Sequence, residues 1–422
     1  MLNSLQLILL CLVLVFFSTD IRVSGMLSLD PNARPTFQLF EFFAAPLVLI
    51  WVYKLAVRQS TITLTNKANL FFGLFVLWAT VISFLANDPF HALSRAKDFF
   101  LAWILFVSFR DLNAQQLEKL MKSSLLLAAF WSIFGIMQMY ELDPWFGSKL
   151  GALFKIGVSW KTVVDPISGE LKDSAFAQGI YLYPQDFSYY LLMPLFLSSW
   201  LVSKNKAWFI LFFIVLLALI GSGSKTFYLL ALIFVFWKVM RMFGVGKWPT
   251  AAAGFIFLMM SILGGMIFLR PERFLRAIGT FIWRTEQWTD TVGMLMERHY
   301  ILLSGHGTEY LEQTYSRFHY PNPHNAILYF LIEYGLIGLL LFAGFLYFVL
   351  RQDQLRSDRG SSTKSNAICK SWHAGSDKFI FSGLLFTLSM TIVDDYFVQT
   401  QLTAIFMFYL GMFNRLNTVQ VK

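Results

Sequence analysis

The chain has 422 residues, of which 57% are hydrophobic and only 14% are charged, and it contains 46 phenylalanines. This composition excludes a soluble protein, because apolar runs long enough to cross a hydrocarbon core of about 30 Å recur from end to end. The runs are too long for barrel strands, so the spans should be helices, which satisfy their own backbone hydrogen bonds in lipid. The formal net charge of +9 does not indicate nucleic acid as a partner, because the basic residues lie between the spans, where they meet lipid head groups.

We predict an all-α polytopic membrane protein with about twelve spans in a single transmembrane domain, residues 1–422. The first apolar run lacks a basic n-region and an Ala-x-Ala site, so we expect a retained span; a cleaved signal peptide is the alternative. Residues 87–97 are expected to form a short polar loop. The sixth and seventh spans begin near residues 185 and 207, and the others are expected at about 5–23, 37–57, 68–86, 98–109, 123–140, 226–240, 250–269, 325–350, 379–393 and 400–415.

Two long interruptions, residues 141–184 and 270–324, separate these spans. The loops on the opposite face, which include residues 351–378, hold just over half of the lysines and arginines. The positive-inside rule therefore places these loops and both termini in the cytoplasm. The two long loops then lie on the outer face, and we expect the first of them to be ordered along the membrane surface.

The second long loop carries a row of arginines. Arg273, Arg276, Thr280 and Arg284 recur at steps of three and four, which predicts one face of a helix. For Arg273 and Arg276 the alternative is an interfacial helix whose arginines contact head groups. Arg284 lies between tryptophans in WRTEQW, and its guanidinium fork fits the paired oxygens of a phosphate, so we expect it to bind substrate.

A second candidate cation is Lys225 in the segment GSGSKT, residues 221–226, between two expected spans. A lysine at a helix start is commonly a snorkelling anchor, which is the simpler reading. Helix-start amides with a lysine and serine hydroxyls also form a favourable site for an anion. The segment lacks the spacing of a nucleotide-binding P-loop.

His324 follows a proline-bounded turn and stands, with Asn325, where the tenth span begins. A neutral imidazole can accept a proton from a hydroxyl at neutral pH. The same loop holds three further histidines, so the chemistry of the residues leaves the choice among four open; the others are His299, His306 and His319.

Acidic residues also fall inside expected spans. Glu333 lies well within the tenth span, and Asp394 and Asp395 end the eleventh. Acids at such depth are functional candidates, and here we expect them to orient arginines or to accept a hydrogen bond from a sugar hydroxyl. No metal-ligand spacing is present, and Cys11 and Cys369 lie far apart in the chain, so we predict no metal site, no cofactor and no disulfide.

Four segments resemble the O-antigen ligase and polymerase superfamily of bacterial envelope glycosyltransferases. PHNAILYFLIEYGLIG (323–338) is similar to the family's H-N…E-x-G-x-x-G pattern, and IWRTEQW followed by LLSGHGTEYL (302–311) to its arginine–tryptophan segment and G-x-G turn. GSGSKTFYLL (221–230) stands at the place of its S-R helix start, and IYLYPQDFSYYLL (180–192) resembles its Pro-Asn entry to a span.

The resemblance implies a GT-C-like enzyme of the bacterial inner membrane with its active site on the periplasmic side. Such an enzyme moves a glycan from undecaprenyl pyrophosphate to a hydroxyl of lipid A–core, with inversion and without a metal. His324 would be the catalytic histidine, with Arg284 and Lys225 on the pyrophosphate. Arg276, Asn325, Asp394 and Asp395 are further candidates for substrate contact. Two positions depart from the pattern: lysine replaces arginine at 225, and Asn322 replaces the first histidine of H-P-H-N.

Several other functions remain open. A polysaccharide polymerase or a protein O-oligosaccharyltransferase of the same superfamily would use the same residues with another acceptor. A polyprenyl-glycan transporter belongs to a different class and would carry charges along several spans and broken helices near the midplane. Here the charge is concentrated at one outer face, which favours chemistry at the membrane surface.

Overall fold

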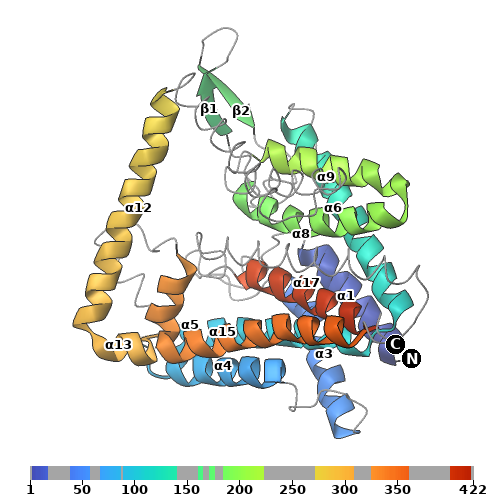
Figure 1. Ribbon diagram of the computed structural model, residues 1–422, viewed down its shortest axis with the longest axis horizontal. Coiled ribbons are helices and arrows are strands. Elements are labelled where there is room, and N and C mark those ends of the chain that lie inside the picture. The colour runs from blue at the N-terminus through green and yellow to red at the C-terminus, as the bar shows by residue number, and fades with distance from the viewer. Residues whose placement is uncertain are drawn as a thin grey trace, which may run out of the picture.

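The structure is a computed structural model that describes residues 2–17, 39–57, 67–86, 89–139, 160–164, 171–175, 184–222, 271–307, 325–360 and 400–419. Figure 1 shows helices packed into a bundle, with α12 standing apart from most of the others. The spans expected at 226–240, 250–269 and 379–393 lie outside the described residues.

The described helices confirm the helical character of the expected spans at 37–57, 68–86 and 123–140, of most of the tenth and twelfth, and of the first as far as Phe17. The 3-10 turns are η1 (Phe109–Asp111) and η3 (Lys206–Trp208). The α-helices are α1 (Leu2–Phe17), α3 (Leu39–Ala56), α4 (Lys67–Ser83), α5 (Pro89–Ser108), α6 (Ala114–Met139), α8 (Pro184–Lys204), α9 (Phe209–Gly221), α12 (Pro271–Glu297), α13 (His299–Ser304), α15 (Ala326–Gly360) and α17 (Thr400–Val419).

Two described helices are long and apolar enough to cross a membrane, namely Ala114–Gln138 and Ile327–Val349. Shorter apolar helices cover Leu2–Phe16, Lys67–Ser83, Lys206–Gly221 and Thr403–Met412. The count of twelve spans therefore remains a prediction, whereas the helical class is observed.

One element departs from the all-α prediction. Strands β1 (Trp160–Val164) and β2 (Leu171–Ala175) form an antiparallel hairpin inside the first long loop, with Trp160 opposite Ala175. The aromatic and β-branched residues of WKTVV favour a strand, and this signal was overlooked in a chain dominated by apolar helices.

The expected loop at 87–97 is wrong, because α5 begins at Pro89 and continues through the charged residues. Proline suits the first turn of a helix, where its missing N–H leaves no bond unmade. The charges find partners in two helices: Lys97 Nζ lies 2.5 Å from Glu41 of α3 and 3.4 Å from Asp98 of α5. Paired charges can thus extend a helix that composition alone would end.

An aromatic core joins α4, α5 and α15. Phe75 of α4 meets Phe99 of α5 with ring centroids 5.0 Å apart, and Phe345 of α15 lies 4.7 Å from Phe72 and 5.3 Å from Phe106. The outward surface is apolar as well: Leu49 and Leu85 are 71% and 72% exposed. Helices that are apolar both inside and outside the bundle are suited to a lipid environment.

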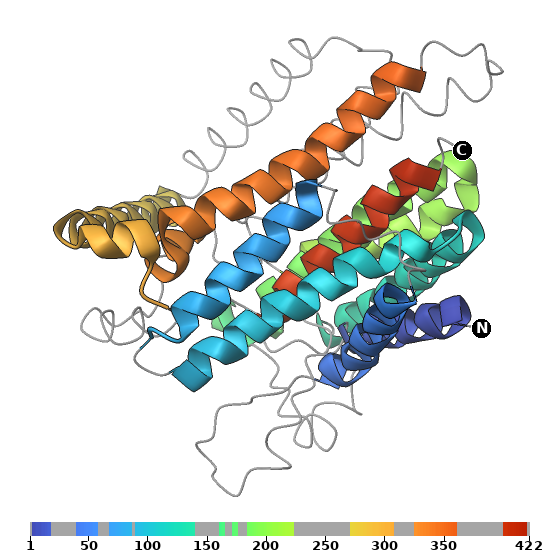
Figure 2. The same ribbon diagram turned by 90° about the horizontal axis from the view of Figure 1, so that it is seen from below.

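A buried lysine holds one end of this bundle together. Lys54 at the end of α3 is 5% exposed, and its Nζ donates to Asn3 at 3.0 Å, to Gln6 at 2.6 Å and to Asp111 at 2.7 Å. Arg415 Nε of α17 donates a hydrogen bond to the carbonyl of Leu112, the residue after Asp111, at 2.9 Å. Helix α1 begins and α17 ends on this side of the molecule (Figures 1 and 2). The Asn325 start of α15 lies at the other end.

Candidate functional site

Helix α12 confirms the helix predicted for the arginine-rich loop. Gln287, Thr291 and Leu295 form its buried face, with exposed fractions of 7%, 1% and 2%. Arg284 precedes Gln287 by one turn and belongs to the same face. The helix face predicted to carry the arginines therefore continues, toward the C-terminal end of α12, into the buried face of the helix. The side chains of Arg273 and Arg276 lie outside the described part.

Arg284 is half-buried, and its Nε is shielded from solvent yet donates no hydrogen bond to any described residue. Next to it on the helix, Gln287 Oε1 is also buried and accepts none within the described part. An unsatisfied buried polar atom is unfavourable by about 1–3 kcal/mol. An anionic oxygen at Arg284 would satisfy this N–H with a charge-assisted hydrogen bond.

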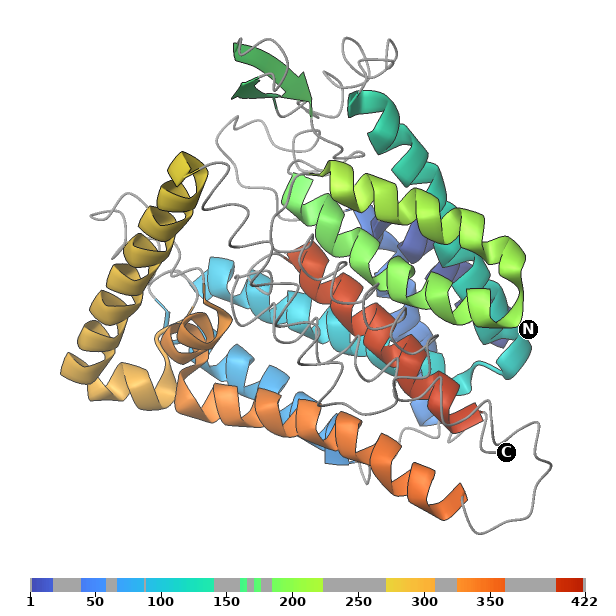
Figure 3. The same ribbon diagram turned by 45° about the horizontal axis from the view of Figure 1, so that its top comes forward.

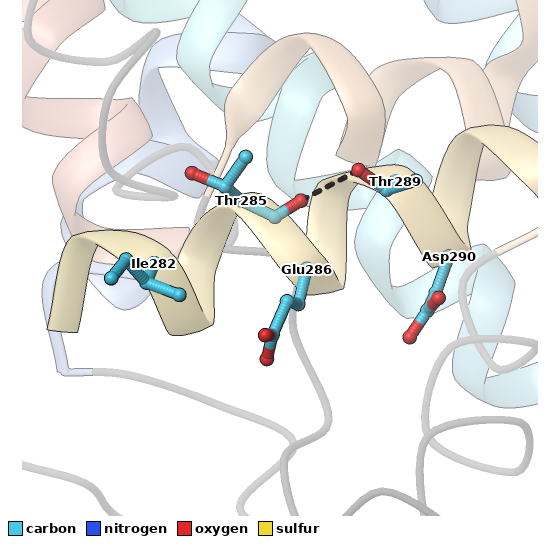
Figure 4. A pocket seen from close by; sticks show the side chains of 5 residues that line it. All are labelled: Ile282, Thr285, Glu286, Thr289 and Asp290. Carbon is cyan, nitrogen blue, oxygen red and sulfur yellow. Dashed lines mark hydrogen bonds between the residues drawn. The ribbon is translucent and has the colours of Figure 1, made fainter. Parts of the chain in front are cut away.

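The opposite face of α12 is acidic. A hollow of about 410 Å³ runs along it, and Figure 4 shows Glu286 and Asp290 pointing to the same side. Thr289 Oγ1 donates to the Thr285 carbonyl at 2.9 Å. Two carboxylates one turn apart would repel a phosphate, so anion binding is expected on the Arg284 face. The described lining consists of Ile282, Thr285, Glu286, Thr289 and Asp290.

Helix α15 is broken at Gly335, where φ is 68° and ψ is −175°. The two parts of α15 meet at a sharp bend (Figures 1 and 3). A break here interrupts the hydrogen bonds that the preceding carbonyls would accept within a helix. Three donors from other segments replace them: His306 N bonds Ile332 O at 2.9 Å, Gly307 N bonds Glu333 O at 3.0 Å and Trp78 Nε1 bonds Tyr334 O at 2.8 Å.

We call the pairing of residues 305–307 with residues 332–335 the glycine clasp. It depends on glycine, because a Cβ on Gly305 would lie 2.4 Å from the Glu333 carbonyl oxygen and one on Gly335 would lie 2.4 Å from that of Leu303. Both residues also have positive φ, 82° and 68°, which glycine adopts without strain. The G-x-G and E-x-G segments of the sequence thus form one structural unit, which ties α13 to α15.

Asn325 caps the start of α15. Its Oδ1 accepts hydrogen bonds from the Ile327 amide at 3.0 Å and the Leu328 amide at 3.2 Å, as expected of an N-cap residue. Its carbonyl accepts from the Tyr329 amide at 2.9 Å. This capping role was not predicted, and it satisfies two of the backbone donors at the start of the helix.

Residues 210–343 match the family described as O-antigen ligase. This segment is an O-antigen ligase domain. The match contains Arg284, the glycine clasp and the bend of α15, and it confirms the resemblance for this part of the chain. A comparison with curated proteins finds no match to the sequence.

The O-antigen ligase domain implies a membrane-embedded lipid-linked glycan transferase, and two described helices are long and apolar enough to cross a membrane. The described residues place Arg284 and Asn325 at the α12–α13–α15 assembly, whose helices contact one another. Lys225, His324, Asp394 and Asp395 lie outside the described residues, so their positions stay predictions. Of the other histidines, His319 also lies outside, while His299 begins α13 and His306 donates its backbone N–H in the clasp.

A cluster of buried charges accompanies the O-antigen ligase domain and was found only in part from the sequence. Glu333 is 1% exposed and Asp98 is 8% exposed, and both interact electrostatically with Arg95 of α5. Arg95 was overlooked because its segment was interpreted as a loop. Recognising the proline-led start of α5 would have placed Arg95 one turn before Asp98. Among the described residues, no group of three or more metal-ligating side chains is present.

Proposed function

We propose that this protein is an O-antigen ligase-type glycosyltransferase of the bacterial inner membrane. It moves a glycan from undecaprenyl pyrophosphate to a sugar hydroxyl of lipid A–core at the periplasmic face, with inversion and without a metal. The observation that carries the proposal is the buried, unsatisfied Nε of Arg284 on the inward face of α12, inside the O-antigen ligase domain. The clasp joins this helix, through α13, to the helix that begins at Asn325.

In the proposed reaction, the acceptor hydroxyl oxygen forms a bond to the anomeric carbon while the bond from that carbon to the pyrophosphate oxygen breaks. Arg284 and Lys225 neutralise the charge that grows on the leaving pyrophosphate, an effect often of a few kcal/mol per donor. His324 accepts the proton of the attacking hydroxyl. Attack from the side opposite the pyrophosphate inverts the anomeric centre.

The bend of α15 supports an enzyme rather than a transporter. Broken helices of transporters expose unwound carbonyls that coordinate ions near the midplane. In this protein the carbonyls of Ile332, Glu333 and Tyr334 already accept hydrogen bonds from the clasp and from Trp78. The break therefore serves packing between segments. Arg284 on α12 is the described cationic group that we propose for the pyrophosphate.

The proposal is tested with purified protein in liposomes that contain an undecaprenyl-pyrophosphate-linked glycan and lipid A–core. We expect transfer with release of undecaprenyl pyrophosphate, and a loss of about 100-fold or more in Arg284→Ala and in His324→Ala. Glu286→Gln is the matched control, because Glu286 lies on the opposite face of the same helix; it should retain the wild-type rate.

Wild-type rates in both Arg284→Ala and His324→Ala would contradict the site assignment. Extension of a second lipid-linked glycan in place of lipid A–core would show a polymerase, and glycan on an acceptor protein would show an oligosaccharyltransferase. Movement of the lipid-linked glycan across the bilayer without release of undecaprenyl pyrophosphate would show a transporter.

A further inference from the structure

Beneath the start of α15, three polar residues share one helix face. Asn325, Tyr329 and Glu333 follow one another at steps of four, which places them in a column. The Tyr329 amide donates to the Asn325 carbonyl at 2.9 Å, and the Tyr329 hydroxyl forms a hydrogen bond with the Glu333 carboxylate. The first turns of α15 thus lie directly above a buried acid on the same helix face.

Glu333 is in turn held by Arg95 from another helix. The Arg95 guanidinium interacts electrostatically with the carboxylates of Glu333 and Asp98. Ring contacts bring α5 against this part of α15, with Phe99 and Tyr334 centroids 5.6 Å apart. In such apolar surroundings charge–charge attraction is much stronger than in water.

The backbone of Glu333 is fixed independently of its side chain. Its carbonyl accepts the Gly307 amide at 3.0 Å in the glycine clasp. The clasp therefore fixes the backbone position of Glu333, and its carboxylate lies within electrostatic reach of Arg95 and Tyr329. Buried ion pairs contribute little net stability compared with apolar residues of the same size, whereas ionisable groups deep in a membrane protein are usually functional.

We propose that Arg95 and Glu333 are positioning residues of the transfer site, which orient the start of α15 at Asn325, the residue that follows His324 in the chain. The proposal rests on the proposed function, in which His324 acts on the acceptor hydroxyl. Neither residue touches substrate in this account. Their loss should misplace the base while leaving the binding of the lipid-linked donor intact.

The first test is steady-state kinetics of Glu333→Gln, Glu333→Asp and Arg95→Gln in the liposome assay. Misplacement of a reacting group by about 1 Å can lower the rate by about 100-fold, so we expect kcat to fall about 30-fold or more in Glu333→Gln and Arg95→Gln. The donor KM should stay within about threefold, and Glu333→Asp should recover part of the loss because it keeps the charge. A wild-type kcat in Glu333→Gln would overturn the proposal.

The second test is a double-mutant cycle with His324. If Glu333 acts through His324, Glu333→Gln should change the residual rate of His324→Ala by less than about twofold. Equal losses in the two backgrounds would show that Glu333 does not act through His324. The control is Asp111→Asn, which removes the carboxylate that pairs with the buried Lys54 and should leave kcat unchanged.

Amide hydrogen exchange gives a result even where no transfer is observed. The Tyr329 amide should exchange at least about 10-fold faster in Glu333→Gln and Arg95→Gln than in the wild type, and not in Asp111→Asn. Unchanged exchange overturns the positioning role whatever the protein transfers. If the variants exchange faster but the wild-type protein transfers no glycan, the structural coupling between Glu333 and the start of α15 stands and the proposed function is rejected.

Discussion

Among the described residues, the buried Lys54 and the half-buried Arg95 lie near opposite ends of α5, and their surroundings differ. Lys54 is matched donor for donor: an ammonium group has three N–H donors, and Asn3, Gln6 and Asp111 accept all of them. Arg95 interacts with the carboxylates of Glu333 and Asp98 next to a helix break. The saturated lysine has nothing left to offer a ligand, so its role is structural, whereas the arginine cluster supports the end that carries the candidate site.

The largest expected effect on stability comes from Lys54→Ala. The substitution leaves the largely buried carboxylate of Asp111 without its cation, and breaking such a pair typically costs about 4 kcal/mol. We expect this loss in the free energy of unfolding in mixed micelles, with an unchanged transfer rate per folded molecule. The double variant Lys54→Met/Asp111→Leu should be more stable than Lys54→Ala. A lower transfer rate per folded molecule in Lys54→Ala would remove the contrast between the two ends.

Gly335→Ala should have the next largest effect. The new Cβ would lie 2.4 Å from the Leu303 carbonyl oxygen at a φ of 68°, so the clasp must open at a cost of about 3 kcal/mol. Both unfolding and transfer assays should detect the change, because the clasp holds α13 against α15. Gly293→Ala is the control, since a Cβ there meets no atom within 4 Å; equal behaviour of the two variants would refute the clasp.

Trp78→Phe removes the hydrogen bond to the Tyr334 carbonyl at the bend. A buried carbonyl left without its donor costs about 2 kcal/mol, measurable as a lower midpoint of denaturation. Trp51→Phe is the matched control, because the buried Trp51 Nε1 donates no hydrogen bond to a described residue. An equal loss in both variants would mean that the Trp78 hydrogen bond contributes nothing specific.

The smallest effect is expected from Asn325→Ala. Loss of a helix N-cap costs about 1 kcal/mol, and Asn325→Asp should retain this stability because its carboxylate can accept the same two amides. Thermal unfolding of both variants measures the capping term. A transfer rate that falls far more than the stability would support the separate substrate contact predicted for Asn325.

The sequence predicts those parts of this protein that have a local signature. The spacing of the arginines gave the helix α12, and the motif around His324 and Asn325 pointed to the helix start. The glycine clasp has no local signature, because it pairs the backbone of residues 305–307 with a helix break far along the chain. The break is stabilised by hydrogen bonds from that other segment. Arg95 was overlooked for a related reason. A run of charged residues predicts a loop, but Glu333 and Asp98 interact with Arg95 and allow its charge inside a helix.

The most direct test of the account compares the release of undecaprenyl pyrophosphate per folded molecule in Arg284→Ala and in Asp111→Asn. We predict that Arg284→Ala lowers the rate by about 100-fold with little change in stability, and that Asp111→Asn lowers stability with the wild-type rate of release. Wild-type release by Arg284→Ala, or an equal loss of release in both variants, would contradict the assignment of chemistry to the Asn325 end and of structure to the Lys54 end.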